Sequence, residues 1–344
     1  MIFPRTARYN KVMVHVNNLF IQEDIKTFPI DPFQIIENNK WGLVTYSELA
    51  WEKGVLVEDI IEAFQSEDGY TIYDGTNYTI AYNNTIKNRG RIRFTLMHEI
   101  GHIYMNHLVD FEETILMRNT LTEKKYKVLE NEANSFARNI LAPVMVVKDL
   151  KINSIDDVIT YFEISRKAAS VRLQTLLNDY RNSLSKFIQF QRHHFSSYIH
   201  SCLYSKQCIV CSYYCVNEEA IFCPICSSNR LSNKKGLIEM KYNGYDVDEL
   251  GRALECPRCG NEELHYDGSH CKVCGTFLVN KCATTEKSTD SGYFYTEESC
   301  HATLDGNARY CVKCGNESTF FQQKLLESWE IEKEEAKERE LLPF

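Results

Sequence analysis

Apolar residues recur at helical spacing through much of the first half of the chain. A first helix is expected within residues 8–28, a second begins at Asp31 or Pro32, and a third runs from Val57 to Phe64. A longer helix is predicted for residues 123–142, where apolar positions recur every three or four residues until a proline ends the pattern. The first half of the chain should therefore be mainly helical.

Two segments of this half have the pattern of β structure instead. Residues 70–82 contain two runs of β-branched and aromatic residues on either side of Asp74-Gly75, which predicts a hairpin with a tight turn. A short extended piece is also expected at residues 42–46. Together with the helices, these strands predict an α+β fold with a small antiparallel sheet.

Residues 154–180 have the pattern of two helices joined by a short turn. The first helix begins after Ser154, a favourable N-cap, and the second runs from Arg166 to Tyr180. This arrangement is helix-turn-helix-like. Direct reading of DNA would place the second helix in a groove, with Arg166, Lys167 and Arg172. The alternative, which we favour, is a helical hairpin packed on the preceding domain.

The strongest chemical signal lies in residues 91–102, which end in His98-Glu99-Ile-Gly-His102. On a helix, histidines four residues apart lie on one face, so both imidazoles can bind one metal ion. Glu99 lies about 100° around the helix from His98 and flanks the metal rather than binding it. Zinc bound in this way keeps a position for water and lowers the pKa of that water to about 7. Glu99 is then placed to act as general base in peptide hydrolysis.

A third metal ligand is expected on the helix at 123–142, which carries two candidate carboxylates. Glu132 lies on the same apolar face as Leu129 and Phe136 and should point inward, where a carboxylate needs a cation as partner. Glu130 is the second choice, and an ordinary solvated glutamate is the alternative for either residue. A His–His–Glu set with one open position is typical of a catalytic zinc site.

The sequence around these residues resembles the ImmA/IrrE family of metallopeptidases. The resemblance lies in Arg93-Phe-Thr-Leu-Met-His-Glu-Ile-Gly-His102, in Glu130-Asn-Glu-Ala-Asn-Ser-Phe-Ala137 and in Pro143, and it covers residues 1–180. It implies a zincin-like endopeptidase that cleaves a helix-turn-helix transcriptional repressor. The segment Asn131-Glu132-Ala133 is also similar to the third-ligand segment of thermolysin-like zinc peptidases, which favours Glu132 over Glu130.

Three neighbouring features bear on this site. The strand at 78–82 is expected to pair with an extended substrate, although a purely structural hairpin is an equal alternative. Residues 108–122 should form a loop or short helix over the cleft and could act as a lid. His107 is expected to be structural, because it is not aligned with His98 and His102.

All 14 cysteines lie between Cys202 and Cys314, which indicates a separate module. The spacing C-x2-C-x11-C-x2-C occurs twice and predicts two four-thiolate zinc ribbons, with Gly260 and Gly275 allowing tight turns after their cysteines. A disulfide scaffold would instead need an oxidising compartment. A third, less regular zinc site is also expected, and Cys202 and Cys215 are left over. The ligands are Cys208, Cys211, Cys223 and Cys226 for the first ribbon; Cys256, Cys259, Cys271 and Cys274 for the second; and Cys282, Cys300, Cys311 and Cys314 for the third site.

A chain of 344 residues with 44% hydrophobic composition has room for several domains. We expect a zincin-like peptidase domain at 1–150, a helix-turn-helix-like extension at 151–186, a linker at 187–205, tandem zinc ribbons at 206–320 and a charged, solvated C-terminal helix at 321–344.

Charge and hydropathy exclude several classes of function. The net charge of −8 argues against a protein that coats nucleic acid, and acidic and basic residues nearly balance between Lys206 and Lys281. No run approaches 18 apolar residues, so no membrane span is expected. Because the first residues lack the apolar segment of a secretory signal, a cytoplasmic protein is expected.

Two functions from different classes fit these observations. The first is a zinc endopeptidase with one catalytic and two or three structural zinc ions, whose substrate is a protein of the repressor type. The second is a regulatory protein whose ribbons and helix-turn-helix-like segment bind protein or DNA partners, with a vestigial peptidase site. The first is favoured, and DNA binding is not.

Overall fold

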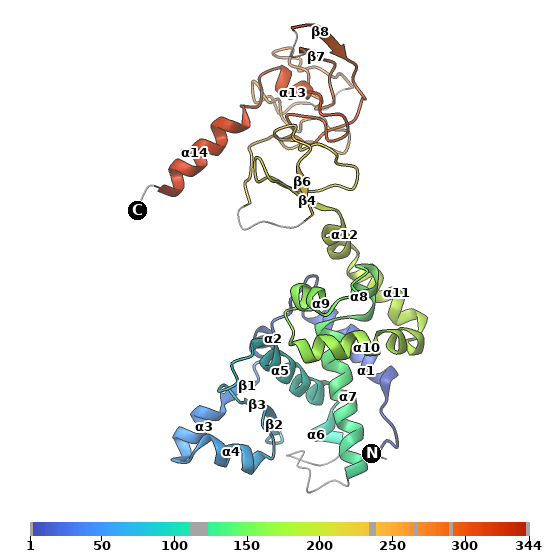
Figure 1. Ribbon diagram of the computed structural model, residues 1–344, viewed down its shortest axis with the longest axis vertical. Helices are drawn as coiled ribbons and strands as arrows, with labels where there is room; N and C mark the ends of the chain where they lie inside the picture. Colours follow the sequence, from blue (N-terminus) through green and yellow to red (C-terminus); the bar gives the residue numbers. More distant parts are fainter. Residues whose placement is uncertain (1–2, 111–122, 234–238, 265–266, 289–291, 342–344) are drawn as a thin grey trace. The chain divides into compact units, whose positions relative to one another are not determined.

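The computed structural model in Figure 1 describes residues 3–110, 123–233, 239–264, 267–288 and 292–341. The chain divides into two compact units, Met1–Ile199 and His200–Phe344. Within the described residues, no helix combines the length and the apolar character needed to cross a membrane.

Three helices form the centre of the first unit. They are α1 (Tyr9–Gln22), α5 (Arg89–Tyr104) and α7 (Glu123–Leu141), and α7 packs against both of the others. A Cβ at Gly101 would lie 3.1 Å from the Phe136 ring and 3.3 Å from the Ala133 backbone, so a glycine here lets α5 and α7 approach closely.

The small sheet of the first unit has the order β1-β3-β2. Strand β1 (Gly42–Thr45) runs parallel to β3 (Tyr78–Tyr82), and β2 (Gly69–Tyr73) is antiparallel to β3. The predicted hairpin is therefore confirmed, but the sheet is mixed rather than antiparallel. The expectation that residues 78–82 offer a free edge to substrate is wrong, because β3 is the central strand. The edge strand that faces α5 is β2.

The remaining helices of the first unit surround this centre. They are α2 (Pro32–Asn38), α3 (Tyr46–Lys53), α4 (Val57–Phe64), α6 (His107–Asp110), α8 (Val144–Asp149), α9 (Ile155–Phe162), α10 (Arg166–Asn182), α11 (Ser185–His194) and the start of α12 (Ser196–Tyr204). The segment expected as a linker, residues 187–205, lies almost entirely in α11 and α12. Its Phe195 is fully buried against Phe20 of α1.

Helices α9 and α10 match the predicted pair, and α10 packs against α8. The Arg172 side chain is fully buried, and its guanidinium donates to Asn139, to the Ala142 carbonyl and to Asp179. A guanidinium held in this way cannot enter a DNA groove, so this geometry fits the packed helical hairpin.

The second unit contains little regular structure. Strands β4 (Ser205–Cys208), β5 (Tyr214–Val216) and β6 (Leu231–Ser232) form one sheet in the order β5-β4-β6, and β7 (Thr285–Ser288) pairs with β8 (Phe294–Glu297). Two helices follow, α13 (Thr319–Gln322) and α14 (Trp329–Leu341).

The cysteines of this unit gather in three groups of four. The members are the three sets expected from the sequence, and Cys202 and Cys215 lie outside them. Neighbouring sulfurs are between 3.4 Å (Cys211–Cys223) and 3.7 Å (Cys259–Cys271) apart. A disulfide bond is only about 2.05 Å long, whereas thiolates on a tetrahedral zinc ion lie about 3.8 Å apart. Each group has the chemistry and spacing to hold one zinc ion.

A recurring turn builds these groups. In five cases the residue after the second cysteine of a pair has a positive φ and donates its N–H to the carbonyl of the first cysteine, with distances such as 2.9 Å for Gly260 and 2.8 Å for Gly275. The expected role of these two glycines is confirmed. In the first group, Ser212 and Ser227 adopt the same left-handed conformation. The same backbone pattern in all three groups supports a common metal-binding design.

Helix α14 is anchored at its start rather than solvated throughout. Glu332 is buried and pairs with Arg309, whose side chain is fully buried as well. Glu332 also accepts a hydrogen bond from the backbone of Asn243 at 2.9 Å. The expectation of a solvated tail is therefore wrong for this first part of the helix.

Candidate active site

Helix α5 places both histidines of the predicted motif. Asn88 caps its start by accepting a hydrogen bond from the Arg91 N–H at 2.9 Å, and the helix continues to Tyr104. His98 and His102 lie one turn apart, with their Nε2 atoms 3.1 Å from each other. Both side chains are largely buried, so the ring nitrogens are held at one point of the protein.

The third side chain at this point is the carboxylate of Glu130 on α7. Its two oxygens lie 3.4 Å from His98 Nε2 and 3.4 Å from His102 Nε2. Burial by itself raises the pKa of Glu130, but the neighbouring rings of His98 and His102 outweigh it and hold the pKa of this carboxyl well below its usual range. Glu130 is thus available as a negatively charged ligand.

The assignment of Glu132 as the third ligand is not what the structure shows. Two residues along a helix turn the side chain by about 200°, so Glu130 and Glu132 face different neighbours. Glu132 is fully buried, as its place on the apolar face predicts, and it does have a cation as partner. That partner is Arg8, whose Nε and Nη2 donate to the two carboxylate oxygens at 2.9 and 2.8 Å.

These three side chains fit a zinc ion. The ligand atoms of His98, His102 and Glu130 all lie within 4.8 Å of one another. Zinc bonds of about 2.1 Å to nitrogen and oxygen in a tetrahedral site place the donor atoms about 3.4 Å apart, close to the observed 3.1 to 3.4 Å. Two imidazoles and one carboxylate also form a donor set that leaves a fourth position open.

Glu99 lies beside this point without joining it. Its side chain is buried, and its Oε2 accepts a hydrogen bond from the Thr71 hydroxyl of strand β2 at 2.6 Å. A cavity of about 70 Å³ is lined by Glu99, the three ligand residues and part of β2. The edge strand, the metal position and the carboxylate therefore share one small polar space.

The imidazoles of His98 and His102 are each oriented by a partner at Nδ1, the ring nitrogen that does not face the metal position. His98 Nδ1 lies 3.1 Å from Asn134 Oδ1, and because an amide oxygen only accepts, His98 must carry its proton on Nδ1. His102 Nδ1 lies 2.9 Å from His107 Nδ1. In both rings Nε2 is therefore the nitrogen that faces the metal position.

His107 is oriented in turn by Glu132. Its Nε2 lies 2.9 Å from the Glu132 carboxylate and must donate, so its Nδ1 is the acceptor for His102. Burial lowers the pKa of His107 to about 3 despite the hydrogen bond to Glu132, so this ring is neutral at physiological pH. Burial raises the pKa of Glu132, but hydrogen bonds from Arg8 and His107 outweigh it and lower the pKa to about 2.

Sequence reasoning missed four residues of this arrangement, namely Thr71, Asn134, Arg8 and the orienting role of His107. Asn134 follows Glu130 by four residues, so helical spacing could have placed it on the same face. Nothing local could have found Arg8, which lies 124 positions before Glu132. Most of the segment expected to form a lid, residues 111–122, lies outside the described residues.

Part of the chain matches a known family. Residues 53–174 match the model of the IrrE N-terminal-like domain, Peptidase_M78. This match supports a metallopeptidase-type function. The M78 segment includes β2, β3, α5 and α7, and hence every residue of the site described above except Arg8. Helix α1 and the whole second unit lie outside it, and no curated protein matches the chain.

Proposed function

We propose that the first unit is a zinc-dependent endopeptidase that hydrolyses a peptide bond in a protein substrate. One observation carries the proposal, which is the convergence of His98 Nε2, His102 Nε2 and the Glu130 carboxylate beside Glu99. When bound, zinc would act as a Lewis acid that polarises a carbonyl group and lowers the pKa of a bound water to near neutral. The match to the M78 family supports the same class of reaction.

In this mechanism Glu99 handles the proton. The Thr71 hydroxyl donates to Oε2 of Glu99 and holds the carboxylate in place, so that Oε1 is available to accept a proton from the attacking water. The same carboxyl group then delivers the proton to the nitrogen of the leaving amine. Asn134 and His107 keep the two imidazoles in fixed orientations throughout.

Strand β2 is the element that we assign to substrate binding. In the described part of the chain it pairs only with β3, and Gly69, Tyr70 and Thr71 line the cavity that contains Glu99. An extended peptide can add to such an edge through backbone hydrogen bonds. We further propose that the substrate is a repressor of the helix-turn-helix type, as the family resemblance implies, and that the second unit contributes to its recognition.

The test is the substitution Glu99→Gln, which removes the base and leaves all three ligands in place. The zinc-loaded full chain is incubated with a peptide mixture prepared from a cell extract, and new N-termini are identified by mass spectrometry. We expect the wild type to produce cleavage sites, and Glu99→Gln to lose them while it retains its zinc. The matched control, Glu62→Gln, changes an exposed residue of α4 and should cleave like the wild type.

Two results would contradict the proposal. One is cleavage by Glu99→Gln at the wild-type rate, which would place the activity elsewhere. The other is the absence of any cleavage by the wild type together with unchanged behaviour of Glu99→Gln in cells. That result would favour the alternative of an interaction protein with a vestigial peptidase site.

A further inference from the structure

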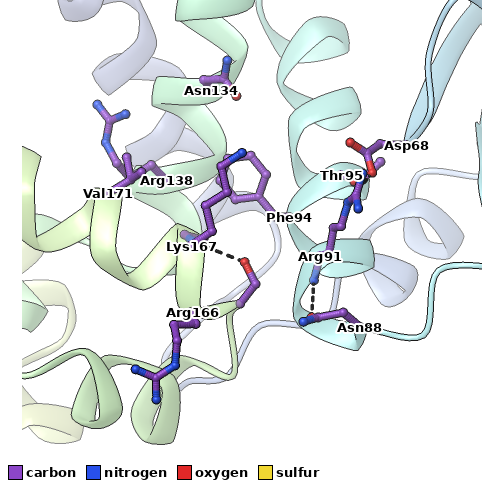
Figure 2. Close-up of a pocket in the computed structure, with 12 residues that line it drawn as sticks. Asp68, Asn88, Arg91, Phe94, Thr95, Asn134, Arg138, Arg166, Lys167 and Val171 are labelled. Carbon is purple, nitrogen blue, oxygen red and sulfur yellow. Dashed lines mark hydrogen bonds and ion pairs between the residues drawn. The ribbon is translucent and has the colours of Figure 1, made fainter.

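A second and much larger cavity lies beside the candidate active site. Its volume is about 670 Å³, and it is lined by residues of α5, α7 and the beginning of α10. Figure 2 shows Arg91 and Thr95 of α5 on one side of it, Arg138 and Lys167 on the other, and the Phe94 ring between them. We call this cavity the basic pocket, and none of the residues assigned to the metal or to proton transfer lines it.

The walls of the basic pocket carry more positive than negative charge. Four lining residues are cationic, and Asp68 is the single acidic one. Asp68 pairs with Arg91 at 2.6 Å, and Arg166 points away from the pocket to pair with Asp156. These two cations are therefore neutralised by partners of their own.

The remaining two cations are not fully neutralised. Arg138 pairs with Asp179 at 3.0 Å, but the same carboxylate also binds the buried Arg172 at 2.8 Å, so one negative charge serves two guanidiniums. Lys167 is exposed and has no ion pair with any carboxylate in the described part of the chain. The pocket thus presents an excess of cations beside the apolar side chains of Phe94 and Val171.

The basic pocket lies next to the metal position. Asn134 lines the pocket, and its side-chain oxygen is the acceptor for His98 Nδ1. Thr95 lines the pocket and lies one helical turn before Glu99 on α5. It packs tightly on Gly69, because a Cβ added at Gly69 would lie 2.5 Å from the Thr95 methyl group. Gly69 belongs to the cavity around the metal position. Asp68, which lines the basic pocket, directly precedes Gly69 at the start of β2, so the two spaces are neighbours along the line of that strand.

The distance between the Arg91 end of the basic pocket and Glu99 suits a bound polypeptide. Arg91 precedes Glu99 by eight residues, which is about 12 Å along the helix axis. An extended peptide covers that distance in about four residues. A substrate that pairs with β2 near Glu99 can therefore place a side chain of the same segment in the basic pocket.

We propose that the basic pocket is a specificity site that binds an acidic side chain of the protein substrate, a few residues from the scissile bond, with Lys167 as its main charged contact. This inference rests on the proposed function, because it places the two sites on one peptide. The excess charge selects an anionic group, and the apolar wall suits the carbon chain of glutamate or a neighbouring apolar residue. A small inorganic anion would make no favourable contact with that apolar surface.

The experiment measures binding and cleavage separately. Binding of short labelled peptide pools to zinc-loaded Glu99→Gln protein is followed by fluorescence anisotropy, with one pool carrying a central Glu-Glu and the other Gln-Gln within randomised flanks. We expect the Glu-Glu pool to bind about tenfold more tightly, and Lys167→Glu to abolish this preference while Lys167→Arg keeps it. A glutamate in the first turn of α10 is favourable for the helix, so Lys167→Glu should fold normally. Lys26→Glu, an exposed lysine in another part of the unit, is the control.

In the cleavage assay, wild-type sites should be enriched in Asp or Glu on one side of the scissile bond, and Lys167→Glu should lose that enrichment while it still cleaves neutral sequences. Equal binding of both pools would overturn the proposal, even if cleavage occurs. Lys167-dependent binding of inorganic phosphate or a DNA duplex, without a difference between the peptide pools, would overturn it too. A peptide preference without any cleavage would instead support the pocket and count against the proposed function.

Discussion

At the scale of single residues, His107 connects a buried carboxylate to a metal ligand. Glu132 fixes the proton of His107 on Nε2, which leaves Nδ1 to accept the proton of His102. His102 is then held as the tautomer whose Nε2 faces the metal position. Arg8 keeps Glu132 charged and in place through three hydrogen bonds. A residue that contacts neither metal nor substrate can therefore tune the metal site.

The substitution His107→Leu should weaken zinc binding at the active site without removing a ligand. Loss of the acceptor frees the His102 ring to rotate and to change tautomer, and comparable losses around zinc ligands reduce affinity by about 10- to 100-fold. Competition against a chelator of known affinity measures this directly. His193→Leu, which changes an exposed histidine of α11, should bind zinc like the wild type. Unchanged zinc affinity in His107→Leu would show that the ring only fills space.

Glu132 also shows how far the sequence alone could define the site. The apolar stripe on α7 correctly indicates that Glu132 is buried and requires a cation. It cannot indicate which cation, because Arg8 reaches this position only after α1 has packed on α7. The His98–His102 spacing is local and predicts that both histidines lie on one face of a helix, as they do on α5, whereas the choice between Glu130 and Glu132 depends on the rotation of one helix against another.

At the scale of elements, a buried ion pair helps to attach α14 to the second unit. Glu332 contributes a carboxylate to the fully buried Arg309, which also donates to backbone carbonyls of Asn243, Asn307 and Glu327. Removal of one partner leaves an uncompensated charge in a poorly hydrated place, which is more costly than the pair is stabilising.

Glu332→Ala should therefore lower the free energy of unfolding of the second unit by about 3–5 kcal/mol. Hydrogen exchange of the amides in β4 to β6, measured in the zinc-loaded full chain, reports on this unit separately from the first. The matched control is Glu330→Ala, which removes an exposed glutamate from the same helix and should change the free energy little. Equal exchange in the two variants would mean that α14 does not stabilise the unit.

The elements that were predicted correctly are those with a local signal. The hairpin of β2 and β3 follows from its turn residues, and α7 follows from its apolar spacing and the proline that ends the pattern. The parallel pairing of β1 with β3 joins segments 37 positions apart, from Gly42 to Thr79, and no local pattern encodes it. For this reason the sequence could not show that β2, rather than β3, is the edge strand near Glu99.

At the scale of the whole molecule, the first and third cysteine groups are connected to each other. The Pro224 carbonyl of the first group accepts the N–H groups of Arg309 and Tyr310 at 2.8 and 2.9 Å, and the Val312 carbonyl of the third group accepts those of Ile221 and Phe222 at 2.8 and 2.9 Å. The two groups are thus joined by reciprocal backbone hydrogen bonds. Free energy from metal binding at one group should therefore help to order the other.

This arrangement predicts four zinc ions per chain, three on thiolates and one on His98, His102 and Glu130. Elemental analysis of the purified full chain gives the number, and Glu130→Gln should reduce it from four to three, because a carboxamide is a much poorer ligand than a carboxylate. Glu99→Gln is the matched control, since it makes the same chemical change beside the metal position and should keep all four ions. The three thiolate-bound ions should also resist a chelator longer than the fourth, because four protein ligands close their coordination sphere. A wild-type count below three would contradict the assignment of the third cysteine group, and a full count in Glu130→Gln would return the third-ligand role to another residue of α7.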